Sequence, residues 1–234
     1  MTETSITFTN ERGEKLTGIL QGSIDRCAVI TCHGMFSNKN GAKQRMLADA
    51  LLTCDIATLR FDFAGCGDSQ GDMRNTTVSR RMADLDAAVN LIASCGAKRI
   101  GLFGSSIGGA VALLTAARDE RIVAISTVAA VGDLASLIER QAENKKLREF
   151  FNPEILVDAR AHDVLSAVTI LHAPLFIIHG EDDDVVPCSD AHDIATSARN
   201  VTLEIIAGIG HRFDDQIILR PLIKRIKNFF VENL

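Results

Sequence analysis

The sequence predicts an α/β fold with a mainly parallel central sheet, an N-terminal antiparallel hairpin, helices on both faces and a short helical cap. Short apolar runs, typical of strands buried on both faces, recur along the chain with helix-period segments between most of them. That alternation favours a parallel sheet covered by helices. The 234 residues, 47% of them hydrophobic, are enough to bury such a core in one domain, 1–234.

The first elements of the chain are predicted to be antiparallel. Residues 6–9 and 16–21 show the apolar and polar alternation of half-buried strands, and the turn-like Asn10-Glu11-Arg12-Gly13 separates them. We therefore expect a hairpin before the parallel part of the sheet begins.

The parallel strands and two of the helices follow in order. Apolar runs predict strands over residues 28–31, 57–63, 100–103, 122–129, 175–178 and 203–206. A helix near residues 77–94 and another just after Ser106 carry apolar stripes, formed by Met82, Leu85, Val89 and Ile92 in the first and by Ile107, Ala110, Leu114 and Ala117 in the second. Both stripes are expected to belong to the core.

A long segment, about 132–172, interrupts this alternation between two strands that a single crossover helix would normally join. Its first part, residues 133–151, mixes apolar positions with a charged run, which suits one amphipathic helix lying over an apolar surface. The segment is predicted to be a cap inserted into the domain; a plain surface excursion is the alternative.

Charge and composition exclude several classes of partner. The formal net charge is −5 at pH 7, and Lys and Arg are dispersed, which argues against a nucleic-acid footprint or a basic membrane-binding face. The first residues lack the pattern of a signal peptide, and no apolar run approaches the roughly 18 to 20 residues of a membrane span. We expect a soluble protein with a small-molecule partner, and its oligomeric state stays unknown.

The cysteine pattern predicts a cytoplasmic location. The six cysteines, at 27, 32, 54, 66, 95 and 188, form no C-x-x-C pair and mostly fall inside apolar patterns, which suits buried reduced thiols better than disulfides or a zinc site. Cys66 stands in a loop and is a candidate for exposure, although catalytic use would require a lowered pKa.

A five-residue motif, Gly104-Ser105-Ser106-Ile107-Gly108, stands where a predicted strand over 99–103 meets the start of a helix. So sharp a turn strains the backbone of its central residue, and side chains at Gly104 and Gly108 would collide with packed neighbours. Ser106 is therefore a candidate nucleophile. The motif alone is also compatible with an ordinary β-to-α turn.

A serine nucleophile requires a base, and the base requires an acid that orients it. The carboxyl ends of parallel strands face one edge of the sheet, so loops that are distant in sequence can meet there. Two loops qualify: Glu181-Asp182-Asp183-Asp184 follows the strand that ends at His179-Gly180, and His211 follows the strand that precedes Gly208-Ile209-Gly210.

Four motifs together resemble the α/β-hydrolase family, over nearly all of the chain. They are His33-Gly34-Met35-Phe36 after a strand, the motif at Ser106, residues 179–187 reading H-G-x-x-D-x-x-V-P, and Gly208-Ile209-Gly210-His211, in the family's order of Ser, Asp and His. With Arg60-Phe61-Asp62-Phe63 and a short cap, the chain is most similar to small carboxylesterases of the feruloyl/cinnamoyl type.

The resemblance implies the following roles. Ser106 is the nucleophile, His211 the general base and later acid, and Asp183 the residue that orients His211. Among the neighbouring carboxylates, Asp183 has the family register, three residues after Gly180 and three before Val186. The backbone N–H groups of Met35 and Ile107 would form the oxyanion hole.

The other polar residues of these motifs are expected to be structural. His33 and His179 are expected to tie loops together through hydrogen bonds, and Asp62 and Asp68 to shape turns. The run Asp182-Asp183-Asp184 predicts no metal site, because consecutive carboxylates point in different directions.

The function implied is a serine hydrolase that cleaves a carboxylic ester through an acyl-enzyme, without cofactor or metal. A thioesterase or peptidase with the same triad is the enzymatic alternative, because fold-level analogy does not select the bond that is cleaved. A non-catalytic small-molecule binding module is the alternative from another class. The acyl and alcohol groups of the substrate are not predicted.

Overall fold

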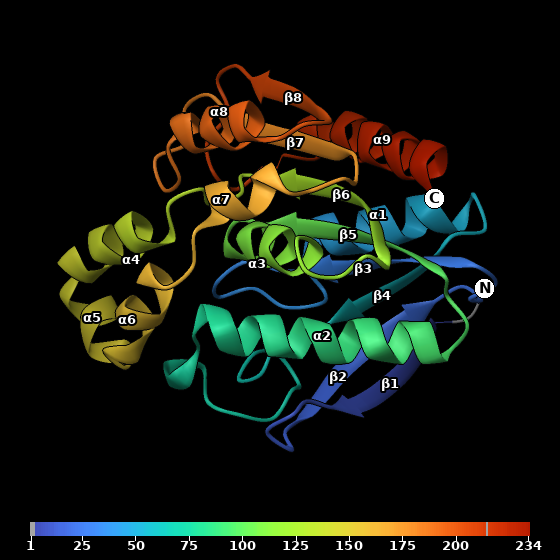
Figure 1. The fold of residues 1–234 in the computed structure, drawn as a ribbon, viewed down its shortest axis with the longest axis horizontal. Coiled ribbons are helices and arrows are strands. Elements are labelled where there is room, and N and C mark those ends of the chain that lie inside the picture. The colour runs from blue at the N-terminus through green and yellow to red at the C-terminus, as the bar shows by residue number, and fades with distance from the viewer. Residues whose placement is uncertain (1–2, 214) are drawn as a thin grey trace.

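The computed structural model describes residues 3–213 and 215–234. In that part of the chain, eight strands form one sheet in the order β1-β2-β4-β3-β5-β6-β7-β8 (Figure 1). β1 pairs antiparallel with β2, and β2 with β4, whereas every later pairing is parallel. The predicted fold class is thereby confirmed. The strands are β1 (Glu3–Thr9), β2 (Lys15–Gln21), β3 (Cys27–Cys32), β4 (Ala57–Phe61), β5 (Arg99–Ser105), β6 (Ile122–Val128), β7 (Leu175–Gly180) and β8 (Val201–Ile206).

Helices cover both faces of the sheet. α1 (Ala42–Leu52) and α9 (Gln216–Asn233) pack on one face with a hydrophobic cluster that includes Val29 and Phe103. The other face carries a larger cluster beneath α2 (Val78–Ser94), α3 (Ile107–Ala116), α7 (Val164–Thr169) and α8 (Cys188–Ser197). A short 3₁₀ helix, η1 (Met73–Asn75), precedes α2. The sheet therefore has a core on each side.

α2 illustrates how the sequence specifies a helix. The Thr77 side chain accepts a hydrogen bond from the backbone N–H of Arg80 and so caps the helix at its predicted start. Leu85, Val89 and Ile92, on the predicted stripe, are completely buried. The apolar period thus identified both the helix and its buried face.

Two strand predictions needed correction. β4 ends at Phe61 rather than at residue 63, because the Asp62 side chain turns to accept a hydrogen bond from the Lys39 backbone N–H. β8 is an edge strand whose residues are mostly half-buried, so burial on both faces was wrong for it. An apolar run does not reveal which strand ends the sheet.

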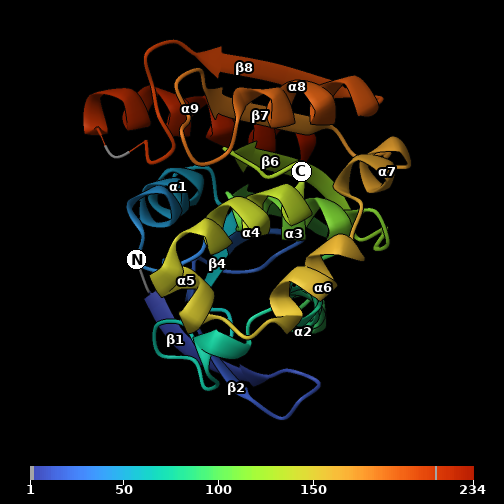
Figure 2. The same ribbon diagram turned by 90° about the vertical axis from the view of Figure 1, so that its left-hand side faces the viewer.

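The segment between β6 and β7 folds into α4 (Leu134–Glu143), α5 (Lys145–Phe150), α6 (Glu154–Arg160) and α7. We call residues 134–160 the insertion. The single helix predicted over 133–151 was wrong: Asn144 leaves the helical conformation and its side chain accepts a hydrogen bond from the Lys146 N–H, which starts a new helix. In Figure 1 the insertion lies on the side to which the arrowheads of β6 and β8 point, and in Figure 2 α4 crosses in front of α3.

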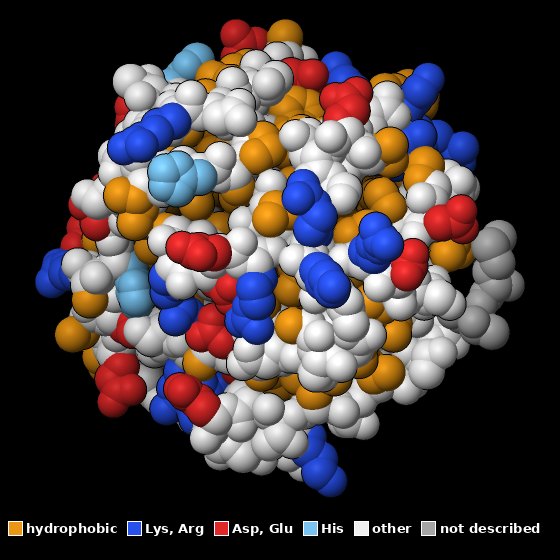
Figure 3. Space-filling view, turned by 45° about the vertical axis from the view of Figure 1, so that its right-hand side comes forward, with side chains coloured by type: hydrophobic (Ala, Val, Ile, Leu, Met, Phe, Trp, Pro, Cys, Tyr) orange, Lys and Arg blue, Asp and Glu red, His pale blue; other side chains and the backbone are white. Residues whose placement is uncertain are grey.

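Charged residues are mixed over much of the surface. On the face drawn in Figure 3, Lys and Arg side chains lie among Asp and Glu side chains, with hydrophobic side chains scattered between them. Among the described residues, no helix is long and apolar enough to cross a membrane.

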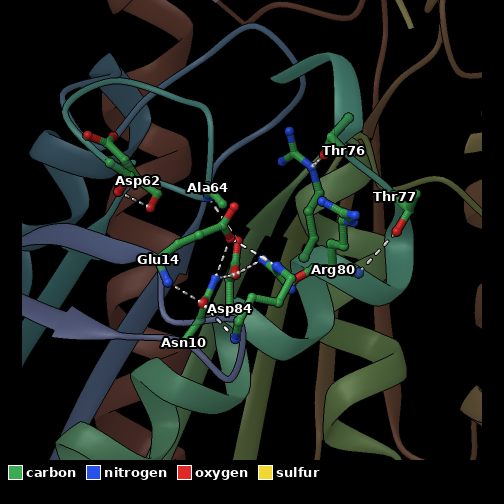
Figure 4. Close-up of polar contacts among 11 residues, drawn as sticks. Asn10, Glu14, Asp62, Ala64, Thr76, Thr77, Arg80 and Asp84 are labelled. Atoms are coloured by element: carbon green, nitrogen blue, oxygen red, sulfur yellow. Dashed lines mark hydrogen bonds and ion pairs between the residues drawn. The ribbon is translucent and has the colours of Figure 1, made fainter. Parts of the chain in front are cut away.

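A buried carboxylate, Asp84 on α2, holds the N-terminal hairpin against the sheet and α2 (Figure 4). Its Oδ1 accepts hydrogen bonds from the side chains of Asn10 and Arg12, both at 2.7 Å, and its Oδ2 accepts one from the Ala64 N–H at 2.8 Å. Burial raises the pKa of Asp84, although these three hydrogen bonds act in the opposite direction. The carboxylate therefore links three segments that are distant in sequence.

We expect Asp84→Ala to lower the free energy of unfolding by about 3 kcal/mol, because it removes the shared acceptor of the hydrogen bonds from Asn10, Arg12 and the Ala64 N–H. Asp86→Ala on the same helix is the control: Asp86 pairs with Arg118 on a part-exposed surface, and its loss should cost less than about 1 kcal/mol. Urea unfolding of both variants measures the difference. Equal losses would show that the Asp84 contacts add nothing beyond a surface pair.

Candidate active site

Ser106 lies in a strained turn between β5 and α3. Its backbone has φ 56° and ψ −128°, in the region that L-residues rarely adopt. A Cβ on Gly104 would lie 2.5 Å from the Gly108 carbonyl oxygen, and a Cβ on Gly108 would overlap the Cys32 carbonyl oxygen. Only glycine fits at these two positions, as the sequence predicted. The turn presents the serine hydroxyl at the carboxyl end of the sheet.

Ser106, His211 and Asp183 form a chain of hydrogen bonds. The Ser106 Oγ is 3.1 Å from the His211 Nε2, and the His211 Nδ1 is 2.8 Å from the Asp183 Oδ2. The Asp183 side chain is fully buried and that of His211 is 18% exposed. If Nδ1 donates its proton to Asp183, Nε2 is left as an acceptor for the serine proton.

Backbone and histidine donors hold the Asp183 carboxylate in place. Its Oδ1 accepts hydrogen bonds from the N–H groups of Val185 and Val186, at 2.9 and 2.8 Å, and the His179 Nε2 lies 3.3 Å from its Oδ2. Burial acts to raise the pKa of Asp183, but the hydrogen bonds from His179, His211 and the Val186 N–H outweigh it and lower the pKa well below its usual range. Asp183 is therefore a carboxylate at neutral pH.

The neighbouring carboxylates lie elsewhere. The side chains of Asp182 and Asp184 are exposed, and His211 makes its carboxylate contact with Asp183. The Asp182 N–H donates to the Ile209 carbonyl at 3.0 Å, which ties the acidic loop to the loop before His211. Of the three adjacent aspartates, Asp183 is therefore the one that contacts His211.

The backbone groups of Met35 and Ile107 flank Ser106. Ile107 is the first residue of α3, so its N–H has no acceptor within the helix. Gly34 packs against Ser106: a Cβ on it would lie 3.3 Å from the Ser106 Cβ, which brings the loop at Met35 beside the hydroxyl. Met35 and Ile107 line the same cavity as Ser106 and His211.

His33 fixes the loop that carries Met35. The Phe63 N–H donates to its Nε2 at 3.2 Å, so the ring is neutral, with Nδ1 donating to the Gly34 carbonyl at 2.8 Å. Burial, followed by the positive charge of Arg81, lowers the pKa of His33 to about 4. The expectation that His33 ties loops together is confirmed. His179 does the same, with its Nε2 2.9 Å from the Val186 carbonyl.

The cavity around Ser106 has a volume of about 950 Å³. One wall comes from the loops at the carboxyl end of the sheet, and the other from the insertion. Its apolar lining includes Met35, Ile107, Leu137, Ile138, Leu147, Phe151, Ile155 and Leu156. The ring centroid of Phe36 lies 5.7 Å from that of Phe151 and 6.1 Å from that of Phe150, in tilted contacts that join the insertion to the loop at Met35.

A buried arginine that sequence reasoning missed lies next to the loop at Met35. The Arg81 Nη2 is 3.5 Å from the Met35 sulfur, its guanidinium carbon lies 4.7 Å from the Phe63 ring centroid, and its Nη1 has no hydrogen-bond partner among the described residues. A signal was present: Arg81 follows Val78 by three residues and precedes Leu85 by four, on the buried stripe of α2.

The structure also places the cysteines and Asp62, which the sequence singled out. All six cysteines are free, and only Cys32 and Cys66 are buried. The predicted exposure of Cys66 was wrong: it is 5% exposed, and burial raises the pKa of its thiol.

Asp62 accepts hydrogen bonds from Lys39 and the Asp68 N–H, as expected of a turn-shaping residue. No group of three His, Cys, Asp or Glu side chains in the described residues is placed to hold a metal ion.

Comparison with known proteins points to one family. Residues 24–152, more than half of the chain, match the family described as serine aminopeptidase, S33. A curated relative, the mitochondrial palmitoyl-protein thioesterase ABHD10 of Bos taurus, is 25% identical over 220 residues, which cover 85% of this chain and 71% of that protein.

Solved structures show the same fold. Est1E from Butyrivibrio proteoclasticus, with ferulic acid bound, superposes with a TM-score of 0.84 at 23% identity and covers 97% of this chain and 98% of its own. The Pyrococcus furiosus esterase Pf2001 gives a TM-score of 0.83 at 25% identity over 99% of this chain and 91% of its own. The likeness confirms the predicted α/β-hydrolase fold.

The lowered pKa of His33 predicts acid sensitivity. The unfolded chain takes up a proton at this histidine near pH 6.5, whereas the folded protein does so near pH 4. The unfolded state therefore binds more protons between these values, and stability falls by about 3 kcal/mol as the pH drops from about 6.5 to about 4. Below that window the loss is complete.

Urea unfolding at about pH 7.5 and about pH 4.5 measures this loss. We expect His33→Gln to be less stable than the wild type at neutral pH but to lose much less stability on acidification. His172→Gln, which changes an exposed histidine, is the control and should keep the wild-type difference. An unchanged difference in His33→Gln would mean that folding does not lower the pKa of His33.

Proposed function

Because the chain belongs to the serine aminopeptidase S33 family of α/β-hydrolases, we propose that it is a serine hydrolase that cleaves a carboxylic ester through an acyl-enzyme on Ser106. The observation that carries the proposal is His211, which lies within hydrogen-bonding distance of both Ser106 and the buried Asp183. A histidine that is hydrogen-bonded between a hydroxyl and a carboxylate is the arrangement that activates serine.

Acylation would proceed as follows. The Ser106 Oγ attacks the carbonyl carbon while the His211 Nε2 takes the hydroxyl proton. The negative charge that develops on the carbonyl oxygen is stabilised by the backbone N–H groups of Met35 and Ile107, and loss of one such donor costs about 3 kcal/mol in related mechanisms. The intermediate then collapses, the ester C–O bond breaks, and the leaving alcohol takes the proton from His211.

Deacylation repeats these steps with water. His211 removes a proton from a water molecule that attacks the acyl carbon, the bond to the Ser106 Oγ breaks, and the serine takes the proton back from His211. Asp183 keeps the imidazole in the required tautomer and stabilises the imidazolium in both halves of the reaction. The products are a carboxylic acid and an alcohol.

A thioester is the second candidate substrate, because the curated relatives are named as palmitoyl-protein thioesterases. The family description adds the amide of a peptide. Matched ester, thioester and amide substrates with one acyl group discriminate among these by the ratio of their kcat/KM values. We also propose a feruloyl or cinnamoyl group as the acyl part of the substrate. Comparing kcat/KM for aryl and alkyl esters tests this.

A binding module without activity is the remaining alternative. A fluorophosphonate probe reacts with an activated serine, so labelling that is lost in Ser106→Ala would argue for the hydrolase. No labelling would favour binding alone.

Two organisational proposals accompany the function. We propose that residues 132–172 act as the cap of one α/β-hydrolase domain, 1–234, since residues of α4, α5 and α6 line the cavity at Ser106.

We also propose a cytoplasmic location on the basis of the free cysteines. The ABHD10 relatives are named as mitochondrial, and cell fractionation would discriminate between the two compartments.

We expect Ser106→Ala to abolish ester hydrolysis and to leave the midpoint of thermal unfolding nearly unchanged, because the hydroxyl acts chemically and contributes little packing. Ser105→Ala, the adjacent serine at the end of β5, is the control and should keep most activity. Turnover of an activated ester and a thermal melt measure the two effects. Reversed phenotypes would assign the nucleophile to Ser105.

We expect Asp183→Asn to lower kcat by about 10⁴-fold, as loss of the orienting carboxylate does in this mechanism. Asp182→Asn and Asp184→Asn remove exposed carboxylates from the same loop and should have much smaller effects. Steady-state kinetics on one ester compares the three variants. Turnover near the wild-type value in Asp183→Asn would move the orienting role to another group.

A further inference from the structure

The charged residues that line the cavity at Ser106 have one sign. Apart from the titratable His211, they are Lys43, Arg148 and Arg212, and the described lining contains no Asp or Glu. The chain as a whole has more acidic than basic residues, 30 against 25. The cavity is therefore lined by positive charge in an acidic protein, unlike the mixed surface in Figure 3.

The cations lie at the solvent side of the cavity. Arg148 and Arg212 are exposed and Lys43 is half-buried, whereas Ile107, Leu137, Ile138 and Ile155 on the apolar lining are buried. The cations belong to three separate segments: Lys43 is at the start of α1, Arg148 is on α5 of the insertion, and Arg212 directly follows His211. We call these three residues the cationic rim.

Two members of the rim are held together. The Lys43 Nζ donates a hydrogen bond to the Arg212 backbone carbonyl and lies 6.0 Å from the centre of the Phe213 ring. In residues 3–213 and 215–234, no carboxylate lies within ion-pair distance of the Arg148 or Arg212 guanidinium. Arg160, also on the insertion, pairs with Glu139 at 2.6 Å. Arg148 and Arg212 therefore have no paired carboxylate in the part of the chain that the structure describes, and both line the cavity.

We propose that the substrate has an apolar acyl part, which enters beneath the insertion, and a negatively charged leaving part, which the cationic rim binds. The proposal rests on the proposed function. His211 passes its proton to the leaving atom, and Arg212 lines the same cavity as His211, so the leaving part would lie on the side of the rim. An acyl chain, by contrast, gains free energy from the buried apolar lining.

Charge on the leaving part is the chemistry that such a rim recognises. Positive groups around one opening raise the local concentration of an anion and accelerate its association, and the effect weakens as salt screens it. Carboxylate and phosphate both fit, because arginine binds either group with two hydrogen bonds.

Two pairs of substrates test the proposal on the intact protein. The octanoyl ester of para-hydroxyphenylacetate carries a carboxylate, and the octanoyl ester of its methyl ester is the neutral match with a similar leaving phenol. Octanoyl-coenzyme A and octanoyl-N-acetylcysteamine form the corresponding pair for phosphate. The quantity measured is the ratio of kcat/KM for the charged member to that for the neutral member.

We expect the wild-type ratio to exceed one by about tenfold at low salt in at least one pair, and to fall as salt is added. Arg148→Gln should lower the ratio by about two- to fivefold, and Arg148→Gln with Arg212→Gln by about tenfold. Lys146→Gln, on the same helix but outside the cavity lining, is the matched control and should leave the ratio unchanged.

The outcomes separate this inference from the proposed function. A wild-type ratio of one or below in both pairs, with the neutral substrates hydrolysed, overturns the charge preference and leaves the serine hydrolase intact. A ratio that the double variant does not change overturns the role of the rim. If no substrate is hydrolysed and no fluorophosphonate labels Ser106, the proposed function itself fails. Because Arg148 is on the insertion, its variant tests the rim even if Arg212→Gln disturbs His211.

Discussion

The close approach of α3 to the ends of β3 and β5 is the constraint on which the site depends. Gly108 leaves no room for a side chain beside the Cys32 carbonyl, and Gly104 none beside the Gly108 carbonyl. This contact forces Ser106 into a positive φ, which costs free energy of order 1 to 3 kcal/mol and persists only because the core on both sides of the sheet holds the two elements. The same contact sets the loop at Gly34 against Ser106. Loosening the packing would therefore move the proposed nucleophile and the proposed oxyanion donors together.

Burial, hydrogen-bond donors and a nearby cation set the protonation states of Asp183 and His33. Asp183 remains a carboxylate because histidine and backbone N–H groups compensate its burial. His33 remains neutral because its ring is buried and the cation of Arg81 is close. A neutral His33 accepts from the Phe63 N–H while the loop at Met35 stays in place, and a protonated ring would lose that bond. The protonation states of Asp183 and His33 are thus decided by groups from loops after four different strands and from helix α2.

The insertion decides what the site can accept. Its helices close one wall of the cavity, and the aromatic contacts of Phe36 with Phe150 and Phe151 join it to the loop at Met35. The break at Asn144 separates α4 from α5, and α5 places Arg148 at the cavity. The place of Arg148 at the cavity therefore depends on the helix that begins after Asn144.

The sequence by itself determined most of the strands, the N-terminal hairpin and the helices on either side of β5, because strand burial, helix period and glycine at a tight turn are local properties of neighbouring residues. The choice of Asp183 among three adjacent carboxylates came from the resemblance to the α/β-hydrolase family. Only the tertiary structure decided that β8 is an edge, that Asn144 divides the first cap helix, that Cys66 is buried, that Arg81 lies beside the loop at Met35, and that the cationic rim lines the cavity at Ser106. These features depend on contacts between residues tens of positions apart, and no local pattern records which distant segments will meet.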